Sequence, residues 1–303
     1  MTRVYLGLGS NLGDRAANLA LARRRLEELG VRVVAASSEE NTEPLGEVEQ
    51  PHFLNQVVEA DTTLGPEALL RVVKSIEVEA GRKPGGVRRG PRELDIDILL
   101  YDGTVLETND LTIPHPGVVD REFIHRELAE IAPTLVADAV ILVDYDPSWA
   151  DRFAAEEARL RSGLGALALR VDHVGSTSVP GLMAKAIIDI QVSVADVTDG
   201  PSYIPTLREL GYAHVPDERF PTYPFFRHPA EGPRDFHLHV AQAGSVEEQE
   251  HLVFRDALRA DPVVARMYLE LKRELARRYF ADRVAYSNSK GEFVHRVLGG
   301  PPA

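Results

Sequence analysis

Cysteine is absent from the sequence, which excludes a disulfide framework, a thiolate metal site and a cysteine nucleophile. No apolar run approaches the ~18 residues that a membrane span needs, and the opening MTRVYLGLGS lacks the pattern of a cleavable signal. Positive charge is scarce, because 34 Lys and Arg stand against 47 Asp and Glu and both halves are acidic. Nucleic acid is not an expected partner, since phosphate contacts dominate such binding. We expect a soluble cytoplasmic protein that binds neither nucleic acid nor membranes.

The chain has 303 residues, more than one ordinary domain needs. Its hydrophobic fraction of 44% and charged fraction of 27% are those of globular proteins. Two domains are expected, residues 1–137 and 138–303, although no linker rich in Ser or Gly marks the boundary.

The first half alternates strand and helix signals. Strands are predicted at residues 3–8, 31–37, 53–63 and 93–101, helices at 14–29 and 66–80, and a loop at 42–46. The order βαββαβ indicates a ferredoxin-like α+β sandwich with its helices on one face of an antiparallel sheet. In the second half, strands are predicted at 140–143, 167–174, 186–194 and 235–240, and helices up to residue 160 and at 246–259 and 262–280.

Asp95 and Asp97 are two residues apart on a predicted strand, so their carboxylates share one face while Ile96 points into the core. Adjacent carboxylates repel, and a hard cation such as Mg²⁺ relieves the repulsion. Five cations and three glycines between Arg82 and Arg92 precede this strand, and arginine pairs well with phosphate oxygens. The pattern favours Mg-nucleotide chemistry over its alternative, a solvated strand edge beside a solvated basic loop.

Several short motifs follow one another along the first half of the chain. They are Gly7–Gly13, Thr42–Gly46, Phe53-Leu54-Asn55, Glu77 with Gly81-Arg82, Arg88–Leu99 (RRGPRELDIDIL), and Pro114-His115-Pro116 with Arg121 and Phe123. Residues 1 to about 136 thereby resemble the family of 6-hydroxymethyl-7,8-dihydropterin pyrophosphokinases, enzymes of folate biosynthesis with a ferredoxin-like fold. The resemblance implies transfer of a pyrophosphoryl group from ATP to the hydroxymethyl group of the pterin, with release of AMP.

The same resemblance implies roles for individual residues. Asp95 and Asp97 would hold two Mg²⁺ ions that bridge the ATP phosphates. The groups that neutralise charge during transfer would be Arg82, Arg92, His115 and Arg121. ATP would also be bound by Lys74, Glu77, Arg88, Ile98 and Thr112. The pterin would contact Thr42, Pro44, Leu45, Gly46 and Asn55 and lie between the rings of Phe53 and Phe123, which could instead be core residues.

The sequence also departs from that family. Arg89 and Pro116 stand where aromatic residues are common, Pro84 stands where some members have a cation, and the family's C-terminal tail is missing after Leu135. The alternative hypothesis is therefore an impaired module that binds ATP and pterin without transfer, with the function carried by the second half.

The second half contains further motifs, Asp146–Trp149, His173–Leu182 and Lys185 with Ile187–Ile190. Residues 139–298 thereby resemble the GrpB-like (UPF0157) family, whose fold is similar to the nucleotidyltransferases. The resemblance suggests a nucleotide or metal site that includes Gly175, Ser176, Lys185 and Asp189. Gln191 stands where those enzymes have a second acid, which argues against catalysis.

His237 and His239 share one face of a predicted strand and could complete a metal site with Asp189. Lys290 is a further candidate anion contact. Ordinary structural roles for all of these residues are the alternative.

Overall fold

The computed structural model describes residues 1–44, 50–82, 90–216, 224–232 and 234–299. The chain divides into two compact units. The first unit consists of Met1–Ile141 together with Leu275–Tyr286, and the second consists of Leu142–Glu274 and the residues from Ser287 onward. No helix formed by the described residues is long and apolar enough to cross a membrane.

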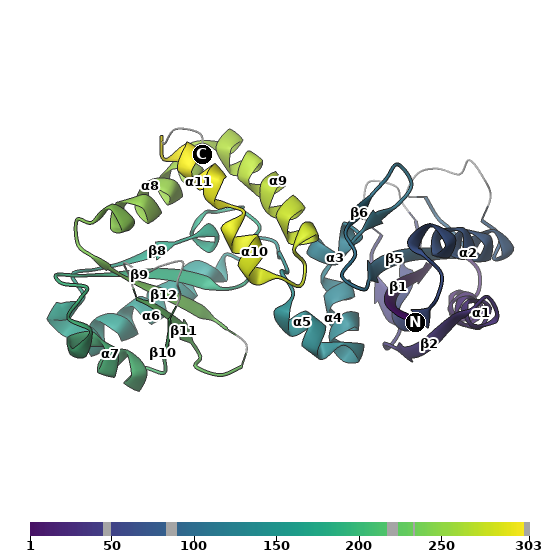
Figure 1. Cartoon of the computed structure of the whole chain (residues 1–303), viewed down its shortest axis with the longest axis horizontal. Coiled ribbons are helices and arrows are strands. Elements are labelled where there is room, and N and C mark those ends of the chain that lie inside the picture. The colour runs from purple at the N-terminus through teal and green to yellow at the C-terminus, as the bar shows by residue number, and fades with distance from the viewer. Residues whose placement is uncertain (45–49, 83–89, 217–223, 233, 300–303) are drawn as a thin grey trace. The chain divides into compact units, whose positions relative to one another are not determined.

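The first unit contains one main sheet and the helices that cover it (Figure 1). Its elements are β1 (Thr2–Ser10), α1 (Arg15–Glu28), β2 (Val31–Ala36), β3 (Glu40–Thr42), β4 (Phe53–Thr62), α2 (Pro66–Glu79), β5 (Asp95–Tyr101), β6 (Leu106–Glu107), β7 (Thr112–Ile113), α3 (Gly117–Asp120), α4 (Glu122–Ile131) and α5 (Pro133–Asp138).

Local chemistry explains the first helices. The Asp14 side chain accepts a hydrogen bond from the Ala17 backbone N–H and caps α1. Gly30, with φ of +86°, follows the end of this helix. Pro66 begins α2, where its missing N–H costs nothing.

The main sheet has the antiparallel order β2-β4-β1-β5, and β3 pairs with the free end of β4. The predicted βαββαβ order and α+β class are confirmed, with β3 as an additional strand. The loop prediction for residue 42 was wrong, because Thr42 pairs with Phe53 as the last residue of β3.

Both faces of this sheet are covered. On one face, Leu6 of β1 and Ile96 of β5 pack with Leu19 of α1 and Val73 of α2. On the other face, the buried cluster includes Val57, Leu99, Val118, Ile124, Leu128 and Phe280. The prediction of helices on one face therefore accounts only for α1 and α2, while α3 to α5 and residues 275–286 cover part of the second face.

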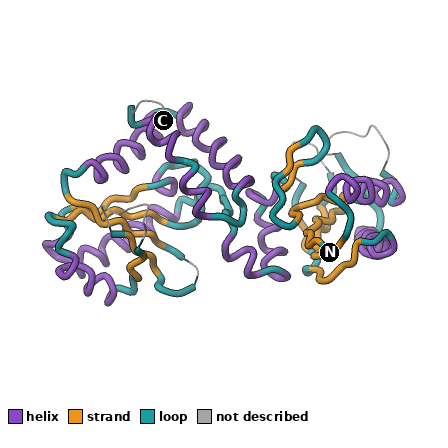
Figure 2. Tube along the Cα trace, in the orientation of Figure 1, coloured by secondary structure: helices purple, strands orange, loops and turns teal. Residues whose placement is uncertain are grey.

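The chain from Ser148 onward forms α6 (Ser148–Leu164), η1 (Gly165–Leu167), β8 (Arg170–Val174), η2 (Ser176–Ser178), β9 (Ile188–Val194), α7 (Gly200–Glu209), β10 (Ala213–Val215), β11 (Phe225–His228), β12 (Phe236–Gln242), α8 (Val246–Ala260), α9 (Pro262–Arg278), α10 (Arg283–Asn288) and α11 (Gly291–Val297). The second sheet has the order β10-β11-β12-β9-β8, with β9 and β12 parallel and the other pairs antiparallel. Helices lie on both sides of it (Figure 2).

The strand predicted at residues 140–143 does not form. Val143 makes only an isolated bridge with Ala184, and the Val140 N–H donates instead to the Phe280 carbonyl at 2.7 Å. An apolar run of four residues does not reveal whether its backbone pairs with a strand or with a more distant segment.

Candidate active site

The strand register places the predicted metal and pterin residues on the same face of the first sheet. Gly9 of β1 pairs with Asn55 of β4 on one side and with Asp95 of β5 on the other. Gly7, two residues earlier, pairs with Asp97. Because Ile96 and Ile98 point into the core with α1 and α2, the two aspartates point to the opposite face. The cross-strand row Asn55–Gly9–Asp95 is the central feature of this candidate site.

Arginines surround Asp95. Its Oδ1 accepts from Arg82 at 2.8 Å, and its Oδ2 lies 2.9 Å from an Arg92 nitrogen. Burial acts to raise the pKa of Asp95, but the charges of Arg92, Lys74 and Arg82 outweigh burial and hold that pKa below its ordinary value. Asp95 is therefore ionised at neutral pH.

Glu77 is a buried acid that binds two of the cations near Asp95. It is 1% exposed. Its Oε1 accepts from the Ile96 N–H at 2.9 Å and from Lys74 at 2.8 Å, and its Oε2 accepts from Arg82 at 2.5 Å. Burial raises the pKa of this carboxyl despite these donors. Glu77 thus orients Arg82 and Lys74.

Asn11 positions Arg92, a role that sequence reasoning did not assign. The Arg92 N–H donates to Asn11 Oδ1 at 2.7 Å, and the Asn11 N–H donates to the Arg92 carbonyl at 3.1 Å. Asn18 of α1 donates to the Glu93 carbonyl at 2.9 Å. The only sequence signal for Asn11 was that it lies within the motif Gly7–Gly13.

His115 lies on the other side of the aspartates. Its Nε2 is 3.8 Å from Asp97 Oδ2, and its Nδ1 accepts from the Gly117 N–H at 3.1 Å. Burial is the main cause that lowers the pKa of His115, so the ring is neutral and carries its proton on Nε2, toward Asp97. The Arg121 side chain lies over Gly117, since a Cβ on Gly117 would come within 2.8 Å of Arg121 Cδ.

The described pterin candidates lie at the other end of the row. Asn55 Nδ2 donates to Thr42 Oγ1 at 2.7 Å, which fixes the amide of Asn55. Phe53 begins β4 on the face of Asn55, and Phe123 of α4 packs against the cluster on that face. The structure shows no ring contact between these two described phenylalanines. Pro44 lies just beyond β3.

For the remaining predicted ATP and pterin contacts, the structure shows less of their relation to the site. Ile98 turns its side chain into the core, so any contact between Ile98 and ATP has to come from its backbone. Thr112 pairs with Glu107 in the small β6–β7 sheet. The predicted contacts Leu45, Gly46 and Arg88 lie outside the described residues.

The donor set suits Mg²⁺. Asp95 and Asp97 supply carboxylate oxygens on one face, and the described residues include no third His, Asp or Glu that would complete a metal cage of side chains. Mg²⁺ is usually held by one or two carboxylates together with water and substrate phosphates. The residues present therefore fit this ion.

In the second unit, Asp189 is close to His237. Asp189 Oδ1 lies 3.3 Å from His237 Nδ1, and a Cβ on Gly175 would clash with Asp189 Oδ2. Burial acts to raise the pKa of Asp189, but His237 and nearby positive charge keep it well below the ordinary value. Gly175, with φ of +69°, allows this close approach.

The predicted metal site with His239 does not form among the described residues, because no group of three His, Asp or Glu side chains is arranged to hold an ion. His237 and His239 do share one face of β12, as expected from their spacing, and both rings contact Phe225. Ser176 begins η2.

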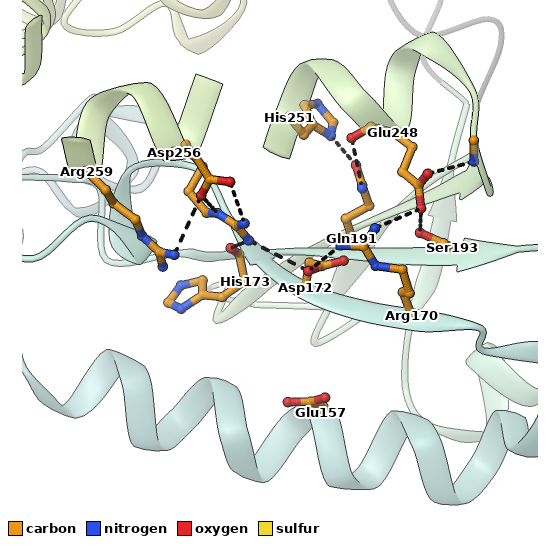
Figure 3. Close-up of polar contacts among 12 residues, drawn as sticks. Glu157, Arg170, Asp172, His173, Gln191, Ser193, Glu248, His251, Asp256 and Arg259 are labelled. Carbon is orange, nitrogen blue, oxygen red and sulfur yellow. Dashed lines mark hydrogen bonds and ion pairs between the residues drawn. The ribbon is translucent and has the colours of Figure 1, made fainter. Parts of the chain in front are cut away.

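Gln191 has a structural role (Figure 3). His251 Nδ1 lies 2.7 Å from Gln191 Oε1, while Gln191 Nε2 donates to the Glu248 carbonyl at 3.3 Å. Ser193 donates to the buried Glu248 carboxylate, whose other oxygen accepts from the Gly244 N–H at 2.7 Å. These bonds attach α8 to β9, so Gln191 serves packing.

A carboxylate pair with converging arginines is an arrangement found in enzymes that act on phosphate groups. Residues 5–133 match the family model of 7,8-dihydro-6-hydroxymethylpterin-pyrophosphokinase (HPPK), and residues 139–299 match that of GrpB protein. The chain belongs to the HPPK family through its first part and to the GrpB family through its second.

Two relatives, one for each part of the chain, agree with this assignment. A 2-amino-4-hydroxy-6-hydroxymethyldihydropteridine pyrophosphokinase of Methylorubrum extorquens is 46% identical over 157 residues, which are 50% of this chain and 99% of that protein. A UPF0157 protein of Halalkalibacterium halodurans is 40% identical over 165 residues, 53% of this chain and 81% of that protein. The crystal structure of GrpB from Enterococcus faecalis is 31% identical, with a TM-score of 0.47, and the match covers 52% of this chain and 95% of that one.

Proposed function

We propose that the first unit transfers the pyrophosphoryl group of ATP to the hydroxymethyl group of 6-hydroxymethyl-7,8-dihydropterin and releases AMP, as a step of tetrahydrofolate biosynthesis. The observation that carries this proposal is the row Asn55–Gly9–Asp95. Neighbouring strands lie about 4.8 Å apart, so Asn55 and Asp95 are separated by about 10 Å across β1. A flat heterocycle at one end and a phosphate chain at the other fit that separation. We also propose the cytoplasm as the location of the chain.

Asp95 and Asp97 would hold Mg²⁺, which would neutralise charge on the ATP phosphates and orient them. Arg82 and Arg92, which contact Asp95 in this structure, would bind those phosphates through their guanidinium groups. Arg121 and the Nε2–H of neutral His115 would stabilise negative charge from the other side. In the proposed reaction the hydroxymethyl oxygen of the pterin would attack the β-phosphorus, and AMP would be the leaving group.

Asn55 would read the hydrogen-bonding edge of the pterin, because Thr42 already fixes its amide orientation. Phe53 and Phe123 would contact the faces of the ring. Of the three substitutions that depart from the HPPK family, Pro116 precedes α3, and Pro84 and Arg89 lie outside the described residues.

The proposal predicts that the full chain releases AMP from ATP and Mg²⁺ only when the dihydropterin is present. AMP can be followed by chromatography, with ATP binding measured in parallel by calorimetry. The alternative, a module that binds without transfer, would show ATP binding and no AMP. Pterin-independent AMP would indicate hydrolysis and would also contradict the proposal.

A further inference from the structure

The end of β1 lies between the segments that enter its two neighbouring strands. β1 pairs antiparallel with β4 on one side and with β5 on the other. Its last residue, Ser10, is therefore beside Leu54 near the start of β4, and Gly9 is beside Asp95 at the start of β5. Asn11 follows directly and is 2% exposed. This position allows the Asn11 side chain to contact both the pterin end and the phosphate end of the proposed site.

The whole side-chain amide of Asn11 is used in such contacts. Its Oδ1 accepts from the Arg92 N–H at 2.7 Å. Its Nδ2 donates to Gln50 Oε1 at 3.0 Å and to the Pro51 carbonyl at 3.1 Å. The segment with Gln50 leads into β4, and Arg92 lies just before β5. Asparagine has one acceptor and two donor protons on a short stem, so a single buried amide holds both segments.

The start of α1 binds the same two segments, but with a separate side chain for each. Arg15 Nη1 donates to the His52 carbonyl at 2.9 Å, at the entry of β4. Asn18 Nδ2 donates to the Glu93 carbonyl at 2.9 Å, at the entry of β5. These two residues therefore each contact one segment, whereas Asn11 joins one segment to the other.

We propose that Asn11 is a positioning residue for pyrophosphoryl transfer, because it fixes the segment that enters β4 relative to the segment that carries Arg92. The inference rests on the function proposed for the first unit. Transfer requires the attacking oxygen and the phosphorus to be about 3–3.5 Å apart, and a displacement of about 1 Å can lower the rate about 100-fold. The pterin would be bound from β4 and the phosphates by Arg92, so a residue that joins the two segments controls this distance.

Three variants of the full chain separate the two sides of the bridge. Asn11→Ala removes both sides, Arg15→Gln weakens the hold on the β4 entry, and Asn18→Ala weakens the hold on the β5 entry. Steady-state AMP release should give a kcat at least about tenfold below wild type for Asn11→Ala, because the reacting groups are no longer aligned. Arg15→Gln should mainly raise KM for the pterin, and Asn18→Ala should mainly raise KM for ATP. Arg24→Gln, at an exposed position of α1, is the control that should match wild type.

Asn18→Ala also controls for a loss of stability. In the described part of the chain, Asn11 and Asn18 each make three side-chain hydrogen bonds, which alanine removes. Thermal unfolding should therefore show similar decreases in Tm, while kcat should fall in Asn11→Ala and remain near wild type in Asn18→Ala. Equal kcat values for these two variants would overturn the positioning role.

Amide hydrogen exchange followed by ¹⁵N NMR tests the bridge without turnover. The Arg92 N–H should exchange at least about tenfold faster in Asn11→Ala than in wild type, because its acceptor is lost. Asn11→Asp keeps an acceptor for Arg92 but loses both donors to residues 50 and 51, so it should restore slow exchange and not kcat. If Asn11→Ala fails to fold, Asn11→Asp decides, and a wild-type kcat in that variant would overturn the proposal.

Failure of this inference is distinct from failure of the proposed function. A wild-type chain that releases no AMP would contradict the proposed function, and with it any role in transfer. An active wild type together with an unchanged kcat in Asn11→Ala would contradict only the role of Asn11. Unchanged exchange of the Arg92 N–H in Asn11→Ala would show that the bridge itself does not hold this segment.

Discussion

Gly9 determines how the two ends of the proposed active site approach each other. A Cβ at this position would come within 3.1 Å of Asn55 Oδ1 and within 3.6 Å of Phe53. The first distance is shorter than an ordinary contact, so the Asn55 amide would have to move. The absence of a side chain on Gly9 therefore helps to hold the pterin end of the row open.

We expect Gly9→Ala to lower kcat/KM for the pterin about tenfold, since displacing one hydrogen-bonding partner costs on the order of 1–2 kcal/mol. The change should appear mainly in KM for the pterin, because Asp95 and Asp97 are unaffected. Steady-state kinetics of AMP release measures this. Gly65→Ala, where a Cβ meets no atom within 4 Å, is the matched control. Equal kinetics for the two variants would contradict the role of Gly9.

Sequence patterns predicted one part of the site and not another. The alternation of Asp95 and Asp97 with Ile96 placed both carboxylates on one face without a structure. That Asn55 and Asp95 both pair with Gly9 depends on the register of three strands, which no local pattern encodes. The two hydrogen bonds between Asn11 and Arg92 join residues that are 81 positions apart. No local sequence pattern could predict them either.

Among the elements, α4 contains a buried acid with an unusual environment. Glu127 is 1% exposed, and neither of its carboxylate oxygens has a hydrogen-bond partner in the described part of the chain. Burial, aided by Glu40 and Glu130, raises the pKa of Glu127 to about 8. Glu130 on the same helix accepts from the Ser38 N–H and hydroxyl, and these bonds lower its pKa.

The two acids should affect stability with opposite dependence on pH. Folding favours protonated Glu127, so its contribution is lost as pH rises from about 4.5 to about 8, by a few kcal/mol in order of magnitude. Glu127→Gln should therefore stabilise the protein more at pH 8 than at pH 5. Thermal unfolding at both values measures the difference.

Glu130→Gln is the comparison. The lowered pKa of Glu130 means that its stabilising effect is present above its unfolded pKa and is lost as pH falls through the folded value. This variant should lower Tm at pH 8 and have less effect in acid. The same sign of change for Glu127→Gln and Glu130→Gln at pH 8 would refute the assignment.

At the scale of the whole molecule, the first unit is completed by a segment from near the end of the chain. Phe280 packs with Val118, Ile124 and Leu128, and its carbonyl accepts from the Val140 N–H. Arg277 forms an ion pair with Glu107 at 2.6 Å. The sequence predicted that the C-terminal tail of the HPPK family was missing, and could not show that residues 275–286 pack against this unit, because contacts across 140 residues leave no local signal.

We expect Phe280→Ala to destabilise the first unit by about 3–5 kcal/mol, the usual cost of removing a buried phenylalanine side chain. In a urea titration that uses pterin-dependent AMP release as its readout, the variant should have a lower midpoint than wild type. Val284→Ala, at an exposed position of the same segment, should leave the midpoint unchanged. An unchanged midpoint for Phe280→Ala would show that residues 275–286 do not support the first unit.

Asp95 and Asp97 are proposed to hold the Mg²⁺ that allows two phosphates to be transferred as one group. The most direct measurement is ³¹P NMR of the products formed from ATP and 6-hydroxymethyl-7,8-dihydropterin by wild type, Asp97→Asn and the exposed-site control Asp110→Asn. Wild type and control should yield pterin diphosphate and AMP in equal amounts, and folded Asp97→Asn should be slower by at least about 100-fold. A pterin monophosphate with ADP, or full activity in Asp97→Asn, would contradict the account.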